Sequence, residues 1–133
     1  DNQKSDDIQD YEWLDPQKFL TANPYFYSGK EKENIIIGFE EKQITQVVDW
    51  FGAEENGLYE ILDIYKIPQV IMKNGQYVKR TVKMVKLKFT QVNIQAFSFW
   101  LMQYIDCLEL LEGEKMKKML RKRMQEALEK RIK

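Results

Sequence analysis

The sequence predicts a mixed α+β fold, and three observations support that class. Short apolar runs at 34–39 and 84–90 alternate in the way that half-buried strands do. Elsewhere, apolar residues recur at the three- and four-residue spacing of amphipathic helices. Between two β-rich runs, the pair Asn74-Gly75 is a strong hairpin signal. The 133 residues, of which 44% are hydrophobic, suffice for one domain with its own core.

A strand over 34–39 is expected to lead into a helix that ends at Phe51. On the strand, the two-residue period places three apolar side chains on one face: Ile35, Ile37 and Phe39. On the helix, the three- and four-residue spacing places four on one face: Ile44, Val47, Val48 and Phe51. Gly52 follows at a position where glycine commonly ends a helix.

Residues 58–67 fit a strand and a helix equally well. In the strand that follows the hairpin, the apolar residues change from even to odd numbers at Met84 and Val85. Because a flat strand cannot switch faces, we expect a bulge or a break at this point. The hairpin 69–84 would then be an extension of a core strand, 84–90.

Asn93 is the predicted N-cap of a helix that ends near Asp106. A short strand over 107–111 follows, and Gly113 separates it from a last helix that begins at about 114. Five apolar residues recur at every fourth position of that helix: Met116, Leu120, Met124, Leu128 and Ile132. The core order, βαββαβ, predicts a ferredoxin-like sandwich, in which helices cover one face of an antiparallel sheet. The extra β-hairpin and the C-terminal helix are additions to that core.

The residue types that most active sites need are missing. The chain has no His and a single Cys, Cys107, which excludes a Ser-His-Asp or Cys-His arrangement, an internal disulfide and a structural zinc site. No glycine-rich phosphate loop occurs, and paired carboxylates such as Glu40-Glu41 are adjacent and point to different faces. We therefore expect no enzyme, no catalytic residue, no metal and no cofactor. One Cys, no signal pattern and no apolar run of membrane-spanning length predict a cytoplasmic protein without membrane contact.

Charge is distributed unevenly although the net charge is zero. Residues 1–60 carry 5 Lys and 14 acidic residues, a net charge of −9, whereas residues 61–133 carry 16 basic and 7 acidic residues, a net charge of +9. Such asymmetry indicates an anion-binding face or two halves that neutralise each other within one fold. The candidate nucleic-acid or effector-binding residues are Lys79, Arg80, Lys86, Lys88 and Arg121. The alternative is that these charges protect an edge hairpin from aggregation and solvate a terminal helix.

The helix after Asn93 has more aromatic surface than one sheet face can bury. Phe97, Phe99 and Trp100 together occupy nearly every side of one turn. This excess predicts a dimer contact at these residues, with contact to a missing domain as the alternative.

Three segments in order carry a resemblance to a known family: "DPQKFLTANPYFYSGKE", "NIIIGFEEKQITQVVDWFG" and "VKLKFTQVNIQAFSFWLMQYIDCLELLEGEKMKKMLRKRMQEAL". They resemble the C-terminal part of WYL-domain transcriptional regulators, the region called WCX: its connector, its first strand and helix, and its later strand, helix, strand and closing helix. The resemblance covers residues 14–128. Residues 53–83 are longer than the family pattern, Gly113 or its neighbour replaces the usual proline, and the WYL barrel and the helix-turn-helix are absent.

The resemblance implies that residues 1–33 are a connector from a missing WYL barrel and that residues 34–133 form a WCX-like domain. The implied function is an effector-sensing and dimerisation domain of a bacterial transcriptional regulator, without its own helix-turn-helix. The implied partners are a second copy, the upstream WYL and winged-helix domains, and a nucleic-acid or nucleotide effector. The alternative from the residues alone is a module that binds single-stranded oligonucleotides through its basic β-face.

Overall fold

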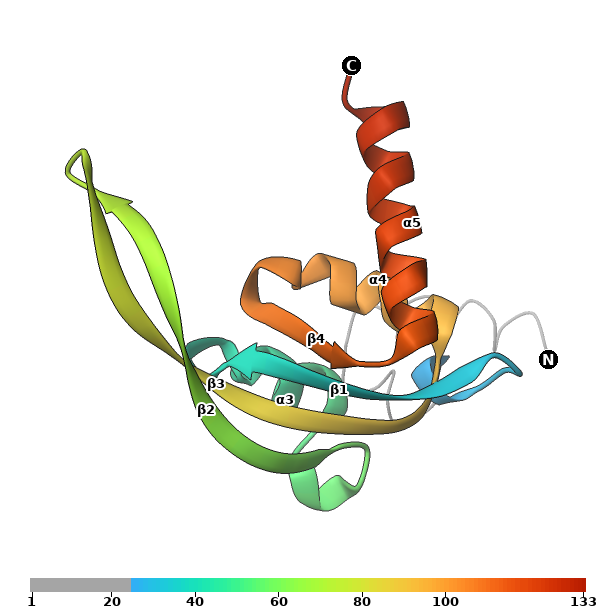
Figure 1. The fold of residues 1–133 in the computed structure, drawn as a ribbon. Coiled ribbons are helices and arrows are strands. Elements are labelled where there is room, and N and C mark those ends of the chain that lie inside the picture. The colour runs from blue at the N-terminus through green and yellow to red at the C-terminus, as the bar shows by residue number, and fades with distance from the viewer. Residues whose placement is uncertain (1–24) are drawn as a thin grey trace, which may run out of the picture.

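The computed structural model describes residues 25–133, so most of the predicted connector 1–33 lies outside the described residues. The described chain forms one four-stranded sheet, in the order β2-β3-β1-β4, with every neighbouring pair antiparallel. Its strands are β1 (Lys32–Glu40), β2 (Glu60–Lys73), β3 (Gln76–Asn93) and β4 (Leu108–Glu112). Its helices are α3 (Thr45–Phe51), α4 (Ile94–Gln103) and α5 (Glu114–Arg131), as Figure 1 shows. The α+β prediction is confirmed.

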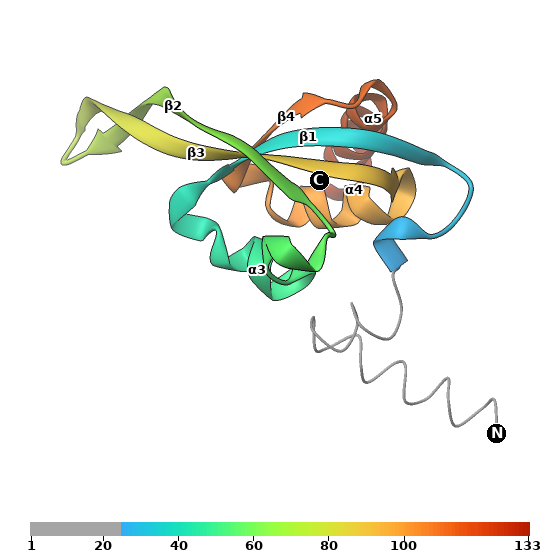
Figure 2. The same cartoon turned by 90° about the horizontal axis from the view of Figure 1, so that it is seen from below.

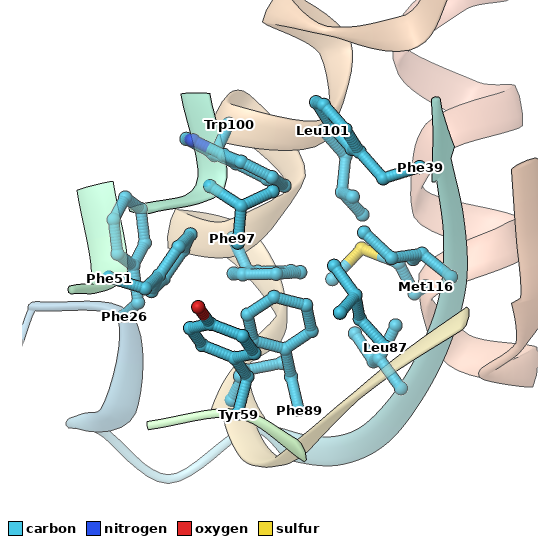
Figure 3. Close-up of a cluster of buried hydrophobic side chains, with 14 of the residues drawn as sticks. Phe26, Phe39, Phe51, Tyr59, Leu87, Phe89, Phe97, Trp100, Leu101 and Met116 are labelled. Carbon is cyan, nitrogen blue, oxygen red and sulfur yellow. The ribbon is translucent and has the colours of Figure 1, made fainter. Parts of the chain in front are cut away.

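The core lies between one face of the sheet and the helices. Ile35, Ile37 and Phe39 of β1 are fully buried, as the two-residue period predicts, and they pair with Phe89, Leu87 and Val85 of β3. Phe51 of α3 lies at the centre of the aromatic part, with five ring centroids within 6.5 Å. These five rings belong to Phe26, Tyr59, Phe89, Phe97 and Trp100 (Figure 3).

Side chains cap the N-termini of helices α4 and α5. The cap of α4 comes from the residue just before the helix, and the cap of α5 comes from a distant strand. The predicted cap at Asn93 is confirmed, because its side chain accepts a hydrogen bond from the Ala96 amide at 2.9 Å. The α5 helix has Gly113 before it, so it has no side-chain cap of its own. The carboxylate of Glu33 on β1 accepts from the amides of Lys115 and Met116 at 3.0 and 2.9 Å. Strand β1 therefore holds the N-terminus of α5, where a negative charge is favoured.

The predicted break at Met84–Val85 is wrong. Strand β3 is continuous, and both residues are buried, on opposite faces of the sheet. Val85 faces the helices, whereas Met84 pairs with Tyr65 on the other face. The apolar residues change parity because the sheet buries side chains on both of its faces at this point. The register irregularities lie elsewhere: between β1 and β3 at Glu33–Ile35, between β1 and β4 at Ile36–Ile37, and between β2 and β3 at Ile61–Asp63.

Two further predictions need correction. The first helix is shorter than expected, because residues 41–43 form a 3₁₀ turn, and Val48 on its predicted core face is 39% exposed. The helix of Asn93 ends at Gln103 rather than near Asp106, and residues 105–107 form another 3₁₀ turn. Gly52 does end α3, with a φ of 77°.

The hairpin at Asn74-Gly75 is confirmed and is longer than expected. Both turn residues have positive φ, 52° and 78°, as a two-residue type I′ turn requires. Of residues 58–67, which the sequence left ambiguous, residues 60–67 belong to strand β2. Because β1 ends opposite Met84, the part of the hairpin beyond it has no third strand beside it. We call residues 66–83 the arm, and it projects away from the sheet in Figures 1 and 2.

Candidate interaction surfaces

The arm combines positive charge with exposed apolar side chains. It carries five cationic residues and no carboxylate: Lys66, Lys73, Lys79, Arg80 and Lys83. Its exposed large apolar residues are Val70, Met72, Tyr77 and Val78, of which Tyr77 is 79% exposed. A two-stranded hairpin is marginally stable alone in water, and exposed apolar residues in such a hairpin favour contact with a partner.

A second surface has the opposite charge. Residues 45–63, which include α3, a 3₁₀ turn at Glu54–Asn56 and the start of β2, carry five carboxylates and no cation: Asp49, Glu54, Glu55, Glu60 and Asp63. All five are exposed, together with the apolar side chains of Val48, Ile61 and Leu62. The Glu54 carboxylate accepts from the Ile61 amide at 2.6 Å, which joins the 3₁₀ turn to β2. We call residues 45–63 the acidic surface.

The predicted basic residues do not meet in one site. Lys79 and Arg80 are exposed on the arm, and the Arg80 Nε donates to Gln69 Oε1 at 2.6 Å. Lys86 and Lys88 are half-buried further along β3, within the sheet. Arg121 is exposed on α5, on the other side of the molecule from the arm in both views (Figures 1 and 2). Lys79 and Lys88 are about 30 Å apart along the strand at roughly 3.4 Å per residue.

The sheet face away from the helices carries a cross-strand contact that sequence reasoning missed. The Tyr65 hydroxyl of β2 donates to Glu109 Oε1 of β4 at 2.7 Å, so the two side chains together span β3 and β1. Gly38 of β1 makes room, because a Cβ there would lie 1.7 Å from the Tyr65 hydroxyl oxygen. The Lys86 Nζ lies 5.8 Å from the centroid of the same ring. The available signal was a glycine inside an apolar strand, which marks close approach by another group.

The Tyr65 contact predicts a pH dependence of stability. Burial, and then the bond to the Glu109 carboxylate, raises the pKa of Tyr65 above the ordinary tyrosine value. Above about pH 10 the unfolded chain loses this proton while the folded chain keeps it, so stability falls as pH rises. Urea unfolding from about pH 9 to about pH 11 should show this fall, and Tyr65→Phe should lessen it. Tyr77→Phe, at an exposed arm position, is the matched control; an unchanged slope in Tyr65→Phe contradicts the assignment.

The three residues predicted as a dimer contact separate in the structure. Phe97 and Trp100 are buried in the core and stack on each other, with their centroids 5.4 Å apart. Neither side chain is therefore open to a partner in this fold. Phe99 is 51% exposed, and the Arg123 guanidinium lies 4.0 Å from its ring centroid. Of the predicted contact, only Phe99 is placed to touch a second molecule.

The apolar residues at every fourth position of α5 are buried only near the N-terminus of the helix. Met116 and Leu120 are buried, as predicted for a core helix face. Leu128 and Ile132 are 62% and 70% exposed. Met124 lies between the buried pair and the exposed pair along the helix, and its exposed fraction is also intermediate. The last turns of α5 therefore extend beyond the core, as Figure 1 also shows.

A small aromatic cavity lies beside Phe99, where α3 and α4 meet residues 25–27. Its volume is about 230 Å³, and its lining is formed by Tyr25, Phe26, Trp50, Ala96, Phe99, Trp100 and Gln103. The Trp50 Nε1 donates to the Tyr104 hydroxyl at 2.9 Å, and that hydroxyl donates to Gln46 at 3.1 Å. The buried Trp100 Nε1, in contrast, has no hydrogen-bond partner within the described part of the chain. A buried donor without a partner costs about 1–3 kcal/mol.

The cysteine and the possible metal ligands of the described residues can be examined directly. Burial, followed by the charges of Glu40 and Asp106, raises the pKa of the Cys107 thiol, which disfavours the nucleophilic thiolate. Between residues 25 and 133 no group of His, Cys, Asp or Glu is arranged to hold a metal ion. No helix in the same range is both long and apolar enough to cross a membrane.

Comparisons of the chain with family models, curated proteins and solved structures gave no match.

Proposed function

We propose that residues 34–133 form the dimerisation and effector-sensing domain of a WYL-type bacterial transcriptional regulator, built on a ferredoxin-like sandwich. The strand order supports the fold: β3 lies between β1 and β2, and β1 lies between β3 and β4. This is the split βαβ arrangement repeated twice. The segments that resemble the WCX region contain β1, α3, α4, β4, most of α5 and the later part of β3, whereas β2 and the arm lie within residues 53–83, where the sequence departs from the family pattern.

The observation that carries dimerisation is the match between the arm and the acidic surface. The arm has five cations beside exposed apolar side chains, and the acidic surface has five carboxylates beside exposed apolar side chains. Both belong to the same chain, at different ends of the β2 strand. In a two-fold dimer, each arm therefore lies on the acidic surface of the other copy, and the interface is used twice. Charge complementarity then sets the orientation and apolar burial supplies the affinity.

The test is a charge-reversal pair followed by mixing. Lys79→Glu with Arg80→Glu reverses the arm, and Glu54→Lys with Glu55→Lys reverses the acidic surface. Each double variant should sediment as a monomer where the original chain sediments as a dimer, because like charges then meet in both interfaces. An equimolar mixture of the two variants should restore a dimer with one copy of each. In it, the reversed arm meets the reversed acidic surface and the original arm meets the original acidic surface, so both contacts pair opposite charges.

The matched control is Lys115→Glu with Lys118→Glu, which makes the same charge change on α5. This variant should remain dimeric. A monomeric original chain, or a mixture that stays monomeric, contradicts the proposed interface.

A second function, binding of single-stranded nucleic acid, is favoured by the absence of any carboxylate in the arm sequence. If the arm grips phosphates, affinity for an oligothymidine should fall steeply with salt, with a logarithmic slope of about −0.7 for each phosphate contacted. Lys79→Ala with Arg80→Ala should then reduce the slope by about 1.4 units. For the sheet face, the equivalent double variant is Lys86→Ala with Lys88→Ala, at two half-buried positions. No binding at low salt removes this function.

A further inference from the structure

An open groove lies between the first turn of α4 and the first half of α5. Its volume is about 340 Å³, and it is lined by Ile94 and Gln95 of α4, by Met119 of α5 and by Glu31 just before β1. Three lysines of α5 complete the lining: Lys115, Lys118 and Lys122. Because these lysines are three and four residues apart, they follow one face of the helix over about 10 Å, at roughly 1.5 Å per residue.

The least exposed residues of the groove are apolar. Ile94 is 4% exposed and Met119 is half-buried against the core, whereas the other lining residues are exposed. The groove has more than twice the volume of an engineered apolar cavity of about 150 Å³ that takes up benzene. Both apolar side chains are aliphatic, and a methionine adapts its shape to what it contacts. This base suits an aliphatic chain of several carbons.

The charge around the groove is positive and is not neutralised by ion pairs. Within residues 25–133, ion pairs involve Lys83 and Lys117, and none involves a lysine of the lining. Among the described residues that line the groove, three cations stand against one carboxylate, Glu31. The groove also lies at the N-terminus of α4, where the positive end of the helix dipole adds to the potential. An anionic group is therefore favoured at its edge.

We propose that this groove binds a fatty acid: the chain lies on Ile94 and Met119, and the lysine ammonium groups hold the carboxylate. Lysine side chains are suited to this, because their aliphatic stems lie along apolar surface while their charges stay at the edge in water. Such a ligand gives the proposed effector-sensing role a chemical class, and only this biological meaning rests on that role. The lining shares no residue with the arm or the acidic surface.

The probe is octanoate, titrated into the full 133-residue chain while the methionine methyl signals are followed by two-dimensional ¹H–¹³C NMR. The Met119 signal is identified by its loss in Met119→Leu. Octanoate should shift this signal in a saturable manner. Octanol, which has the same chain without the charge, should bind about tenfold more weakly, because it lacks the charge-assisted contact. Acetate, which has the charge without the chain, should leave the signal unchanged.

A triple variant removes the positive charge of the groove at three exposed positions, where substitution has little effect on folding. It consists of Lys115→Gln, Lys118→Gln and Lys122→Gln. This variant should weaken octanoate binding by at least about tenfold and leave octanol binding unchanged. The matched control removes three positive charges at the C-terminus, outside the lining, and should bind octanoate as the original chain does: Lys130→Gln, Arg131→Gln and Lys133→Gln.

Glu31→Gln tests the sign of the effect, because it removes the carboxylate that repels the ligand. It should strengthen octanoate binding by about twofold, the usual size of an exposed charge interaction. The proposal is overturned if octanoate leaves the Met119 signal unchanged, if octanol or acetate matches octanoate, or if the lysine triple variant binds octanoate as well as the original chain. Sedimentation is measured without octanoate, so ligand binding and arm-mediated dimerisation can fail separately.

Discussion

Phe51→Ala is expected to remove about 3–5 kcal/mol of folding free energy, the usual cost of deleting a fully buried aromatic ring. Phe51 is fully buried, and its ring lies within 6.5 Å of five others, so no single neighbour can move to fill the space. Because domains of this kind have total stabilities of about 5–15 kcal/mol, the variant should be close to unfolded. Urea unfolding followed by circular dichroism measures the loss.

The matched control for this change is Phe99→Ala, the same substitution on a ring that is half exposed. It should cost less than about 1 kcal/mol, as most surface substitutions do. Equal losses in the two variants would mean that the aromatic cluster around Phe51 does not hold the helices to the sheet.

Gly38→Ala is expected to destabilise the chain by about 1–3 kcal/mol, the range for overfilling a packed site. The new methyl group would lie 1.7 Å from the Tyr65 hydroxyl oxygen, so the ring must swing out and leave Glu109. Urea unfolding measures the loss. A double-mutant cycle identifies its cause: Tyr65→Phe should cost stability in the original chain but little in Gly38→Ala. If the two changes are additive, the strain at Gly38 has another source.

The matched control for Gly38→Ala is Gly57→Ala, where no atom lies within 4 Å of the added Cβ. Its φ of 84° also disfavours alanine, so this variant measures backbone strain without a steric clash. Gly38 has no positive φ, so a loss there cannot come from this strain and is assigned to the clash with Tyr65.

Local patterns predicted the elements of the fold well, because each of them depends on neighbouring residues. The face of β1, the turn at Asn74-Gly75 and the cap at Asn93 all follow from local spacing and side-chain type. The supposed break at Met84–Val85 was wrong because its physical cause is not local: the same strand buries Val85 under the helices and Met84 beside Tyr65. Periodicity in one strand cannot show that both faces of a sheet are covered.

The surfaces were less predictable than the elements. Sequence reasoning singled out Lys79 and Arg80, but grouped them with Arg121, which the fold places on another element far from the arm. It also treated Phe97 and Trp100 as surplus apolar surface, although contacts with α3 and β1 bury both. The contact between Tyr65 and Glu109 joins residues that are 44 positions apart. The cavity at Trp100 is lined by residues from three elements. No spacing rule within one segment can find such pairs.

The course of β3 without a break between the arm and the sheet has a mechanical consequence. The same strand runs from Gln76, next to the hairpin turn, to Asn93 at the start of α4. Because no loop separates the arm from the sheet along β3, the direction of the arm follows the direction of that strand. The angle between two molecules joined through their arms is then set by the twist of the strands, and a partner that bends the arm also moves Phe89 beneath the aromatic rings.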